Sequence, residues 1–511
     1  MSWIRSQEVT SISARGAQLA YRESIAVLPA ALLLILLVAA SAVSLTAQTF
    51  KILHSFCSTS SGGYCTDGQN PNTTLVQGAN GYLYGTTFYG GPGNYGTIFK
   101  IATGGGKLTT LYNFCSLASC ADGTQPEGGL LLASNGNFYG VTNTGGAFGY
   151  GTVFEITAAG KLTTLHSFNQ TDGAYPEAGL IQATNGNLYG TTYVGGADSA
   201  GTAFEITLGG TFTSLHSFCG TGSTCSEGDG LSSGLTQATD GNFYGTAYGG
   251  GPESGCFPYS GGGTFFQLTS SGTVTALFMF CQPYGFYPGS APVQASNGNF
   301  YGTTTTGGGG INVGSGTVYE MTPTGANTSL YTFCLQTACA DGKDPQTLIL
   351  ATDGNFYGVT YSGGANSALG TIFKMTPANQ LTTLHTFANS GAGGTNPIGA
   401  LLLDTNGTFY GTTWSGGKNG GYGTIFSLAT GLAPFVEPIP TSGKVGSKVT
   451  ILGTNLKGAT AVSFNGTAAT FRVVSSSEIT ATVPTGATSG TVAVTTLSGT
   501  TLDSNVEFKI P

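Results

Sequence analysis

Side chains that could act as an acid, a base or a metal ligand are scarce in this sequence. Its 511 residues include four histidines, and all four occupy one position of a repeated pattern that other copies fill with Tyr112, Phe278 or Tyr331. A side chain that recurs at one repeat position serves the repeat, so we expect these histidines to pack as aromatic rings or to form hydrogen bonds along a strand. A histidine-based catalytic triad or metal site therefore has little material. The histidines are His54, His166, His216 and His385.

The acidic residues make only a weak case for catalysis. Acid and base catalysis of the glycosidase type needs two carboxylates placed several ångströms apart. Glu127 and Glu177 stand at equivalent positions of consecutive repeats, while Asp198 and Glu253 are irregular loop acids. Nothing in their spacing selects a pair, so we expect no catalytic residue and no enzyme. A polysaccharide hydrolase or lyase that uses these loop acids is the alternative.

A second set of acids precedes glycines in the loops between repeats. An Asp before a Gly can accept backbone N–H bonds and fix a turn, which is the role that we expect here. Calcium is the alternative, but it needs six to eight oxygen ligands and each loop offers one carboxylate. We therefore expect no metal and no cofactor. The residues are Asp67, Asp122, Asp172, Asp229 and Asp341.

An aromatic position that varies between repeats is the best candidate for binding. It lies four residues after a repeated tyrosine, just before a Gly-Gly pair, and is filled by Phe88, Asn143, Tyr193, Tyr248, Thr305, Tyr361 and Trp414. Flat rings among Thr, Asn and Gly, with little charge, suit stacking on neutral sugars. Packing between repeats is the other interpretation, and both stay open. The ligand-binding candidates are Phe88, Tyr193, Tyr248, Tyr361 and Trp414, with Trp414 the residue best suited to binding.

The elements that position these residues are seven copies of one unit. A Tyr-Gly dipeptide recurs at intervals of 50 to 57 residues, at Tyr84, Tyr139, Tyr189, Tyr244, Tyr301, Tyr357 and Tyr410. The third copy shows the pattern of four strands: residues 179–183, an Asn-Gly turn at Asn185 and Gly186, and then residues 187–192, 201–207 and 211–218. Four antiparallel strands repeated at this length predict one blade of a β-propeller.

The two ends of the array predict a closed ring. Residues 50–56 form a lone strand of the fourth type, and residues 423–428 form a strand of the third type with no fourth strand behind it. If the first strand completes the last blade, two exposed sheet edges disappear. An open solenoid has no use for this permutation. We therefore predict an all-β fold, with a seven-bladed β-propeller over residues 49–429.

Composition supports this fold class and excludes one class of partner. The 85 glycines oppose long helices, and only 7% of the residues are charged. Three of the arginines, Arg5, Arg15 and Arg22, precede the repeats, which leaves Arg472. Nucleic acid binding normally needs Lys and Arg to neutralise phosphates, so we expect no nucleic acid partner.

The ten cysteines predict an oxidising compartment. Four close pairs recur at one repeat location, namely Cys57 with Cys65, Cys115 with Cys120, Cys219 with Cys225, and Cys334 with Cys339. Cys281 occupies the same location, and Cys256 in the preceding loop is its expected partner. Zinc is the alternative, but zinc ligands cluster in fours and these pairs belong to separate repeats. We predict five local disulfides.

The repeat resembles the Gloeobacter and Verrucomicrobia (GloVer) repeat of choice-of-anchor tandem repeat proteins. The resemblance rests on the Phe-Tyr-Gly-Thr-Thr and Gly-Thr-Val-Phe-Glu-Ile blocks and on the Leu-Thr-Thr-Leu-His-Ser-Phe strand, and it covers residues 49–429. It implies an extracellular bacterial repeat protein. It brings no activity or catalytic residues, and it leaves the form of anchoring open.

The segments outside the repeats differ in character. Residues 438–511 resemble an IPT/TIG domain, an immunoglobulin-like sandwich, and their alternating strands between Gly, Pro and Asn turns indicate the same class. Residues 430–437 read as a linker. Residues 1–47 join a basic stretch to an apolar run that ends in Ala40, Ser41 and Ala42, which is typical of a signal peptide cleaved after Ala42 or Ala47. An uncleaved membrane anchor is the alternative.

These features together predict a secreted or cell-envelope binding scaffold. We expect its partner to be an extracellular glycan or a protein, and we expect a monomer with no membrane span in the mature chain. The sandwich would act as a spacer. A purely structural envelope protein without a ligand is a further alternative.

Overall fold

The computed structural model describes residues 48–219, 225–251, 261–309, 315–366, 368–388 and 391–511. The chain divides into two compact units, Met1–Ala47 and Gln48–Pro511, and the predicted signal peptide lies outside the described residues. Helix is limited there to two short 3-10 turns, η1 (Ala118–Cys120) and η2 (Thr337–Cys339). No helix within the described ranges is long and apolar enough to cross a membrane. The all-β prediction is confirmed.

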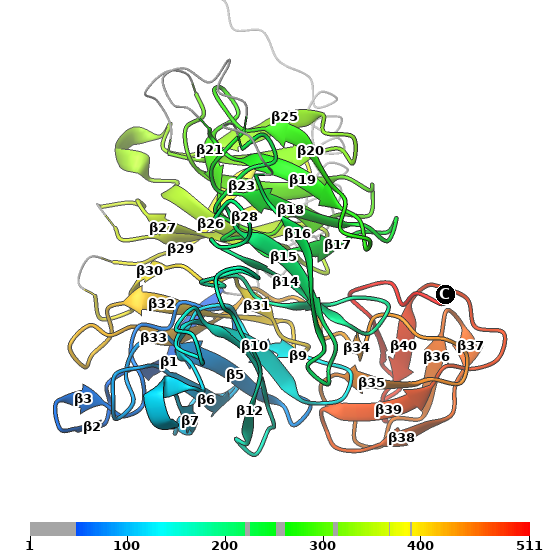
Figure 1. The fold of residues 1–511 in the computed structure, drawn as a ribbon. Helices are drawn as coiled ribbons and strands as arrows, with labels where there is room; N and C mark the ends of the chain where they lie inside the picture. The colour runs from blue at the N-terminus through cyan, green and yellow to red at the C-terminus, as the bar shows by residue number, and fades with distance from the viewer. Residues whose placement is uncertain (1–47, 220–224, 252–260, 310–314, 367, 389–390) are drawn as a thin grey trace, which may run out of the picture. The chain divides into compact units, whose positions relative to one another are not determined.

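Among the described residues, seven antiparallel sheets of four or five strands follow one another along residues 49–429, besides one two-stranded hairpin (Figure 1). Sheet I contains β4 (Val76–Gln77), β5 (Tyr82–Thr87), β6 (Thr97–Ala102) and β7 (Thr109–Asn113). Sheet II contains β8 (Thr124–Pro126), β9 (Leu131–Leu132), β10 (Phe138–Thr144), β11 (Thr152–Ile156) and β12 (Leu162–Ser167). Sheet III contains β13 (Ile181–Gln182), β14 (Leu188–Thr192), β15 (Thr202–Ile206) and β16 (Phe212–Ser217). Sheet IV contains β17 (Thr236–Gln237), β18 (Phe243–Ala247), β19 (Thr264–Leu268) and β20 (Val274–Met279).

The remaining three sheets keep the same order. Sheet V contains β21 (Phe286–Pro288), β22 (Val293–Gln294), β23 (Phe300–Thr306), β24 (Thr317–Met321) and β25 (Asn327–Thr332). Sheet VI contains β26 (Lys343–Leu350), β27 (Phe356–Ser362), β28 (Thr371–Met375) and β29 (Leu381–Thr386). Sheet VII contains β30 (Thr395–Pro397), β31 (Leu402–Leu403), β32 (Thr408–Ser415), β33 (Thr424–Ala429) and, from the start of the chain, β1 (Thr49–Ser55).

The strand β1 completes the last sheet, as the sequence predicts. It runs antiparallel to β33, with Thr49 opposite Ala429 and Ser55 opposite Thr424. A second link joins the same two ends of the array, because the Asn70 N–H donates to the Tyr422 carbonyl at 2.8 Å. Equivalent N–H groups join each sheet to the one before it, over 2.7 to 3.2 Å, at Gln125, Tyr175, Gly230, Tyr287, Asp344 and Asn396. Every sheet is therefore bonded to two neighbours.

The repeated tyrosine and its turn explain why each unit folds alike. Gly186 has φ +89, which a glycine adopts without steric cost, and it closes the predicted turn by donating to the Ala183 carbonyl. Asn185 then donates from Nδ2 to the Tyr189 hydroxyl at 2.8 Å. The Tyr189 ring stacks on Phe243 of the next sheet, with ring centroids 4.2 Å apart. Such aromatic pairs contribute about 0.5–1.5 kcal/mol beyond their buried area, so the core lies between neighbouring sheets.

Residues after the last repeat form two four-stranded sheets around one core. One sheet contains β34 (Glu437–Ile439), β35 (Lys448–Leu452), β39 (Glu478–Thr482) and β38 (Phe471–Val473), and the other β37 (Thr467–Ala468), β36 (Ala461–Phe464), β40 (Val492–Thr495) and β41 (Thr501–Asp503). Ile451 and Ile479 of the first sheet share that core with Phe464 and Val494 of the second. The buried Val436 also belongs to it, so this sandwich begins inside the segment expected as a linker.

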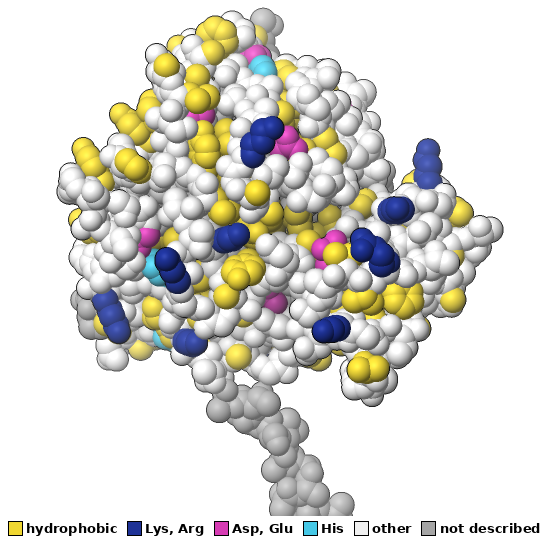
Figure 2. Space-filling view, turned by 90° about the horizontal axis from the view of Figure 1, so that it is seen from below, with side chains coloured by type: hydrophobic (Ala, Val, Ile, Leu, Met, Phe, Trp, Pro, Cys, Tyr) yellow, Lys and Arg dark blue, Asp and Glu magenta, His cyan; other side chains and the backbone are white. Residues whose placement is uncertain are grey.

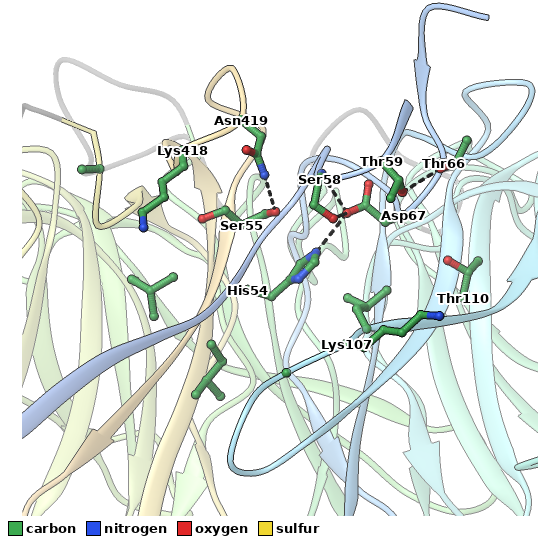
Figure 3. A pocket seen from close by; sticks show the side chains of 15 residues that line it. His54, Ser55, Ser58, Thr59, Thr66, Asp67, Lys107, Thr110, Lys418 and Asn419 are labelled. Atoms are coloured by element: carbon green, nitrogen blue, oxygen red, sulfur yellow. Dashed lines mark hydrogen bonds and ion pairs between the residues drawn. The ribbon is translucent and has the colours of Figure 1, made fainter. Parts of the chain in front are cut away.

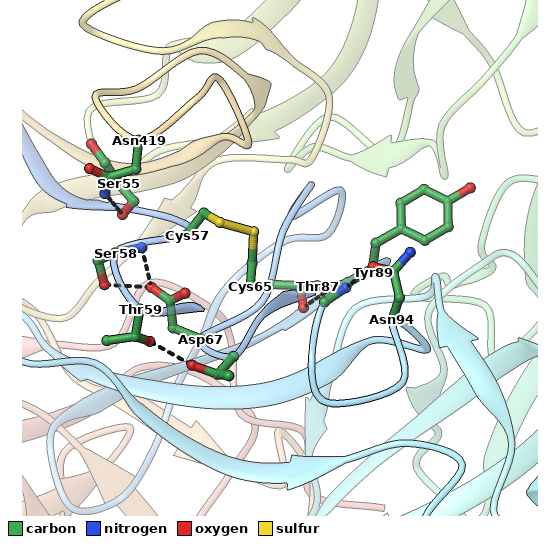
Figure 4. Close-up of a disulfide and its surroundings, with 12 residues drawn as sticks. Ser55, Cys57, Ser58, Thr59, Cys65, Asp67, Thr87, Tyr89, Asn94 and Asn419 are labelled. Atoms are coloured by element: carbon green, nitrogen blue, oxygen red, sulfur yellow. Dashed lines mark hydrogen bonds between the residues drawn. A yellow bond between two sulfur atoms is a disulfide. The ribbon is translucent and has the colours of Figure 1, made fainter. Parts of the chain in front are cut away.

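Four of the five predicted disulfides are present among the described residues. They join Cys57 to Cys65, Cys115 to Cys120, Cys219 to Cys225, and Cys334 to Cys339. The first closes the loop that carries the short hairpin β2 (Ser60–Ser61) and β3 (Tyr64–Cys65), beside Ser58 and Asp67 (Figure 4). Cys281 has no disulfide partner within the described part of the chain. Its expected partner, Cys256, lies outside that part.

Candidate functional site

The candidate aromatic residues lie at the end of β5, β14, β18, β27 and β32 that is opposite the turn of the repeat, with Phe88, Tyr193 and Tyr248 directly after the strand and Tyr361 and Trp414 one residue before its last. Phe88 and Trp414, from sheets I and VII, bring their ring centroids to 5.9 Å. Tyr193 and Tyr248, from sheets III and IV, interact electrostatically, since burial raises the pKa of the Tyr248 hydroxyl and Tyr287 and Tyr193 raise it further. Tyr361 is fixed through its backbone carbonyl, which accepts a hydrogen bond from Asn396 Nδ2 at 3.1 Å. The structure thus supports two aromatic groups and a separate Tyr361.

The exposure of these rings is compatible with ligand binding and with packing between repeats. Tyr248 is 39% exposed, while Phe88, Tyr193, Tyr361 and Trp414 are half-buried. Packing between repeats and contact with a ligand are therefore compatible at one position.

One aromatic residue of this region escapes sequence reasoning. Tyr287 stacks on Tyr248 with centroids 4.8 Å apart and planes 16° from parallel. It occupies the inter-sheet bonding position, which precedes a proline in six of the seven repeats and has φ +60 here. Five other repeats place Asn, Gln, Gly or Asp there and one places Tyr175, so an aromatic residue before proline, which occurs twice, was the available signal. We call Tyr193, Tyr248 and Tyr287 the aromatic arc.

Glu127 and Glu177 line one cavity. The cavity measures about 970 Å³ and receives lining residues from all seven sheets, mostly Gly, Ala, Ser and Thr, together with Glu507 and Lys509 from the sandwich. Both glutamates follow a pre-strand proline, at equivalent positions of sheets II and III. Their common register therefore places them side by side on the wall of the cavity. We call them the carboxyl pair.

The surroundings of the carboxyl pair favour its protonated form. Burial raises the pKa of Glu127 to about 8, the charge of Glu177 adds to the shift, and a hydrogen bond from Asn143 opposes it. Burial likewise raises the pKa of Glu177 to about 7. Burial also raises the pKa of Tyr193, and the charge of Glu177 contributes to that shift, which connects the pair with the aromatic arc. A protonated carboxyl group both donates and accepts hydrogen bonds, so the pair can bind hydroxyl groups without adding charge.

The other acids proposed for catalysis do not join this site. Asp198 is exposed on the loop between β14 and β15, and Glu253 lies outside the described residues. The carboxyl pair is therefore the one combination of those four acids that the described residues bring together. The repeat spacing placed its members at equivalent positions, but it did not reveal their burial.

The histidines bind the acids of the inter-repeat loops. His54 Nε2 lies 3.0 Å from Asp67 Oδ2, and His166 Nε2 lies 3.0 Å from Asp172 Oδ2. Tyrosines at the same position do likewise, since the hydroxyls of Tyr112 and Tyr331 donate to Asp122 and Asp341 at 2.8 and 2.9 Å. His385 instead stacks on Phe50, with centroids 3.6 Å apart. The predicted packing and hydrogen-bonding roles of the histidines are confirmed.

The prediction of Asp229 as one of the loop acids that share the repeat position is wrong, and Glu227 takes that position. His216 Nε2 contacts Glu227 Oε2 at 2.8 Å, and Glu227, not Asp229, precedes the glycine equivalent to Gly68. Asp229 stands two residues further on, where burial raises its pKa. Both Glu227 and Asp229 precede a glycine, and the prediction chose Asp229 because it forms the Asp-Gly dipeptide of the other repeats.

The described loop acids are not arranged as a Ser-His-Asp triad. Ser58 Oγ donates to Asp67 Oδ2 at 2.6 Å, on the same oxygen that faces His54 Nε2, so the carboxylate lies between Ser and His and the imidazole does not face the hydroxyl. Elsewhere among the described residues, three potential metal ligands meet at Cys219, Cys225 and Asp229. The two sulfurs are joined in a disulfide and offer no thiolate.

Comparison with known proteins places the chain in a family. Residues 39–258 and 253–461 match the Gloeobacter/Verrucomicrobia repeat in two successive segments, and residues 435–510 match the IPT/TIG domain. No curated protein matches the chain.

Solved structures resemble the chain only in part. The extracellular domain of a candidate hybrid two-component system of B. thetaiotaomicron is 12% identical with a TM-score of 0.46, over 86% of this chain but only 53% of that chain. A candidate 6-phosphogluconolactonase of Bacteroides uniformis is 15% identical with a TM-score of 0.40, over 62% of this chain and 84% of that chain. At these values neither match bears on activity or ligand. The two repeat matches span most of the sequence, and the chain belongs to the Gloeobacter/Verrucomicrobia repeat family, with an IPT/TIG domain at its C-terminal end.

Proposed function

We propose that this protein is an extracellular or cell-envelope scaffold, built on a seven-bladed β-propeller, that binds a neutral glycan without transforming it. The observation that carries the proposal is the carboxyl pair in the wall of one cavity, with Glu177 near enough to Tyr193 of the aromatic arc for its charge to act on that hydroxyl. Near neutral pH Glu127 is largely protonated and Glu177 is about half protonated, because the pKa of Glu127 is raised to about 8 and that of Glu177 to about 7. A ligand at this site meets rings and carboxyl groups of reduced charge that donate and accept hydrogen bonds, a combination that suits a sugar.

The charge of the surroundings points to an uncharged ligand. Only Glu507 and Lys509 of the sandwich add charge to the cavity besides the pair itself, and Lys509 Nζ already lies 3.4 Å from the Ala238 carbonyl. The face shown in Figure 2 carries its charged side chains among a largely uncharged surface. Long-range steering of a charged ligand is therefore weak here.

An extracellular location accords with the disulfides. Four of them close short loops, and disulfides persist in oxidising compartments. Family membership points the same way.

The test is affinity electrophoresis of the purified chain through gels that contain a soluble β-glucan, a xylan or a galactomannan. We expect retardation by at least one polymer and about tenfold weaker binding for Tyr248→Ala, since loss of one stacking ring costs about 1.4 kcal/mol. Tyr82→Ala is the matched control, because Tyr82 is 41% exposed against 39% for Tyr248 and lies at the Asn-Gly turn. Absence of retardation by every polymer, or equal loss in both variants, would reject the proposal in favour of a ligand-free structural protein.

A polysaccharide hydrolase or lyase is the second candidate. The observation that favours it is the mutual influence of Glu127 and Glu177, because one protonated and one ionised carboxyl group can serve as acid and base. Release of new sugar ends from the same polymers, abolished by Glu127→Gln or Glu177→Gln, would establish it. Retardation without release would leave the binding scaffold.

A further inference from the structure

A second pocket lies at the outer rim of the ring, where sheet VII meets sheet I. It measures about 560 Å³ and lies between β1 and the turn before β7, next to the loop closed by the Cys57–Cys65 disulfide. Figure 3 shows Lys418 and Lys107 on either side of His54. Its polar lining includes Ser58, Thr59, Thr66 and Thr110. The carboxyl pair and the aromatic arc play no part in it.

A difference in residue type at one repeat position explains why this pocket is open. At the junction of sheets II and III, Phe212 stacks on His166 with centroids 3.8 Å apart and planes 4° from parallel. At the junction of sheets VI and VII, Phe50 covers His385 in the same way. The sequence places Leu108 where those phenylalanines stand, four residues before the histidine position. A leucine cannot cover the His54 ring as a flat phenyl group does, so space remains.

Two lysines that line the pocket have no ion-pair partner among the described residues. Lys107 and Lys418 are both exposed, and neither ammonium group forms an ion pair with any described residue. The acid of the pocket, Asp67, is buried, and its Oδ2 already receives Ser58 N and Ser58 Oγ besides facing His54. Asp67 forms no ion pair with either lysine.

We propose that this pocket binds an acidic sugar chain, with Lys107 and Lys418 attracting its carboxylates or sulfates from opposite sides of the pocket and the threonine and serine hydroxyls facing the sugar rings. Two unpaired ammonium groups select an anion, and charge-assisted hydrogen bonds are about twice as strong as neutral ones. The pocket also presents the apolar side chains of Ile52, Leu53 and Leu108, and this mixture of hydroxyl groups and apolar surface, together with the size of the pocket, suits a sugar. This site is separate from the proposed neutral-glycan site, and it stands or falls independently.

The experiment measures retardation of the full chain at low ionic strength by three polymers. Polygalacturonate supplies carboxylates, dextran sulfate supplies sulfates, and unmodified dextran is the neutral control. We expect retardation by one or both acidic polymers, in spite of the net charge of −8, and weakening as salt is added.

Variants separate the pocket from general charge effects. Lys107→Ala with Lys418→Ala, and separately Leu108→Phe, which introduces the ring found at the two covered junctions, should each weaken binding about tenfold or more. Lys161→Ala and Leu162→Phe are matched controls at the equivalent positions of sheet II, and they should leave binding unchanged. If Leu108→Phe fails to fold, as judged by its melting temperature, the lysine variant decides. Absence of retardation by both acidic polymers, or equal loss in the controls, would overturn the proposal.

Discussion

Two sets of carboxyl groups in this protein differ in their recurrence between repeats, in their partners and in the direction of their pKa shifts. The loop acids at the rim of the ring recur from repeat to repeat, and each meets a His or Tyr at one fixed position. The carboxyl pair occurs in two repeats and has no cationic partner among the described residues. Hydrogen bonds from His54 and Ser58 outweigh burial and lower the pKa of Asp67, whereas burial and Glu177 raise the pKa of Glu127 to about 8. Repetition thus marks the acids that hold the fold, and its absence marks those free to bind a ligand.

The largest effect should come from removing a repeated acid. Asp122 is fully buried and accepts hydrogen bonds from the Tyr112 hydroxyl and from Ser116 N and Leu117 N. Asp122→Ala leaves these buried donors without an acceptor, so we expect the free energy of unfolding to fall by about 3 kcal/mol. Urea denaturation measures the change, with the exposed Asp198→Ala as control. A loss in Asp122→Ala no greater than that in the control would erase the distinction between the two sets.

An intermediate effect should appear in Glu127→Gln at alkaline pH. Because the folded-state pKa of Glu127 lies above its unfolded value, the stability that this group contributes is complete below about pH 4.5 and is lost as the pH rises through about 8. We expect the wild type to lose about 2 kcal/mol more than the variant between acid and alkaline pH. Melting curves across that range test this, and parallel curves for the two proteins would contradict it.

The smallest effect should have the opposite sign. The folded-state pKa of Asp67 lies below its ordinary value of 3.8, so its stabilising contribution is present above that pH and is lost as the pH falls through the folded value. Asp67→Asn should therefore cost about 1 kcal/mol at neutral pH, with the difference from wild type shrinking in acid. The measurement is the same set of melting curves. A difference that grows in acid would show that Asp67 is not held as a carboxylate.

Much of the fold could be predicted from the sequence because one unit recurs seven times. The Tyr-Gly and Asn-Gly dipeptides mark the same turn in each copy, and the unpaired strand at residues 50–56 indicates closure on residues 423–428. The repeats also showed which histidines share one role. Sequence comparison could not identify their partners, because the loops between β12 and β13 and between β16 and β17 differ in length. That difference is why Glu227 was overlooked for Asp229.

The candidate site could be predicted only in part. The aromatic position after each repeated tyrosine was visible, but which rings meet depends on contacts between neighbouring sheets, and Tyr287 belongs to a different repeat position from Tyr248. The equivalence of Glu127 and Glu177 was also visible. Burial raises the pKa of both groups and the charge of Glu177 raises that of Glu127 further, and neither cause is expressed in residue type or spacing.

The most direct test of the account is to titrate the carboxyl carbons of Glu127 and Glu177 by NMR after selective labelling, with Glu127→Gln and Glu177→Gln for assignment. The account predicts titration midpoints near 8 for Glu127 and near 7 for Glu177. In Glu127→Gln, the Glu177 signal should titrate in a single step, because its neighbouring carboxyl group has been removed. Midpoints near the ordinary glutamate value of 4.5 for both groups would show that the cavity holds two solvated carboxylates, and the neutral binding site would be contradicted.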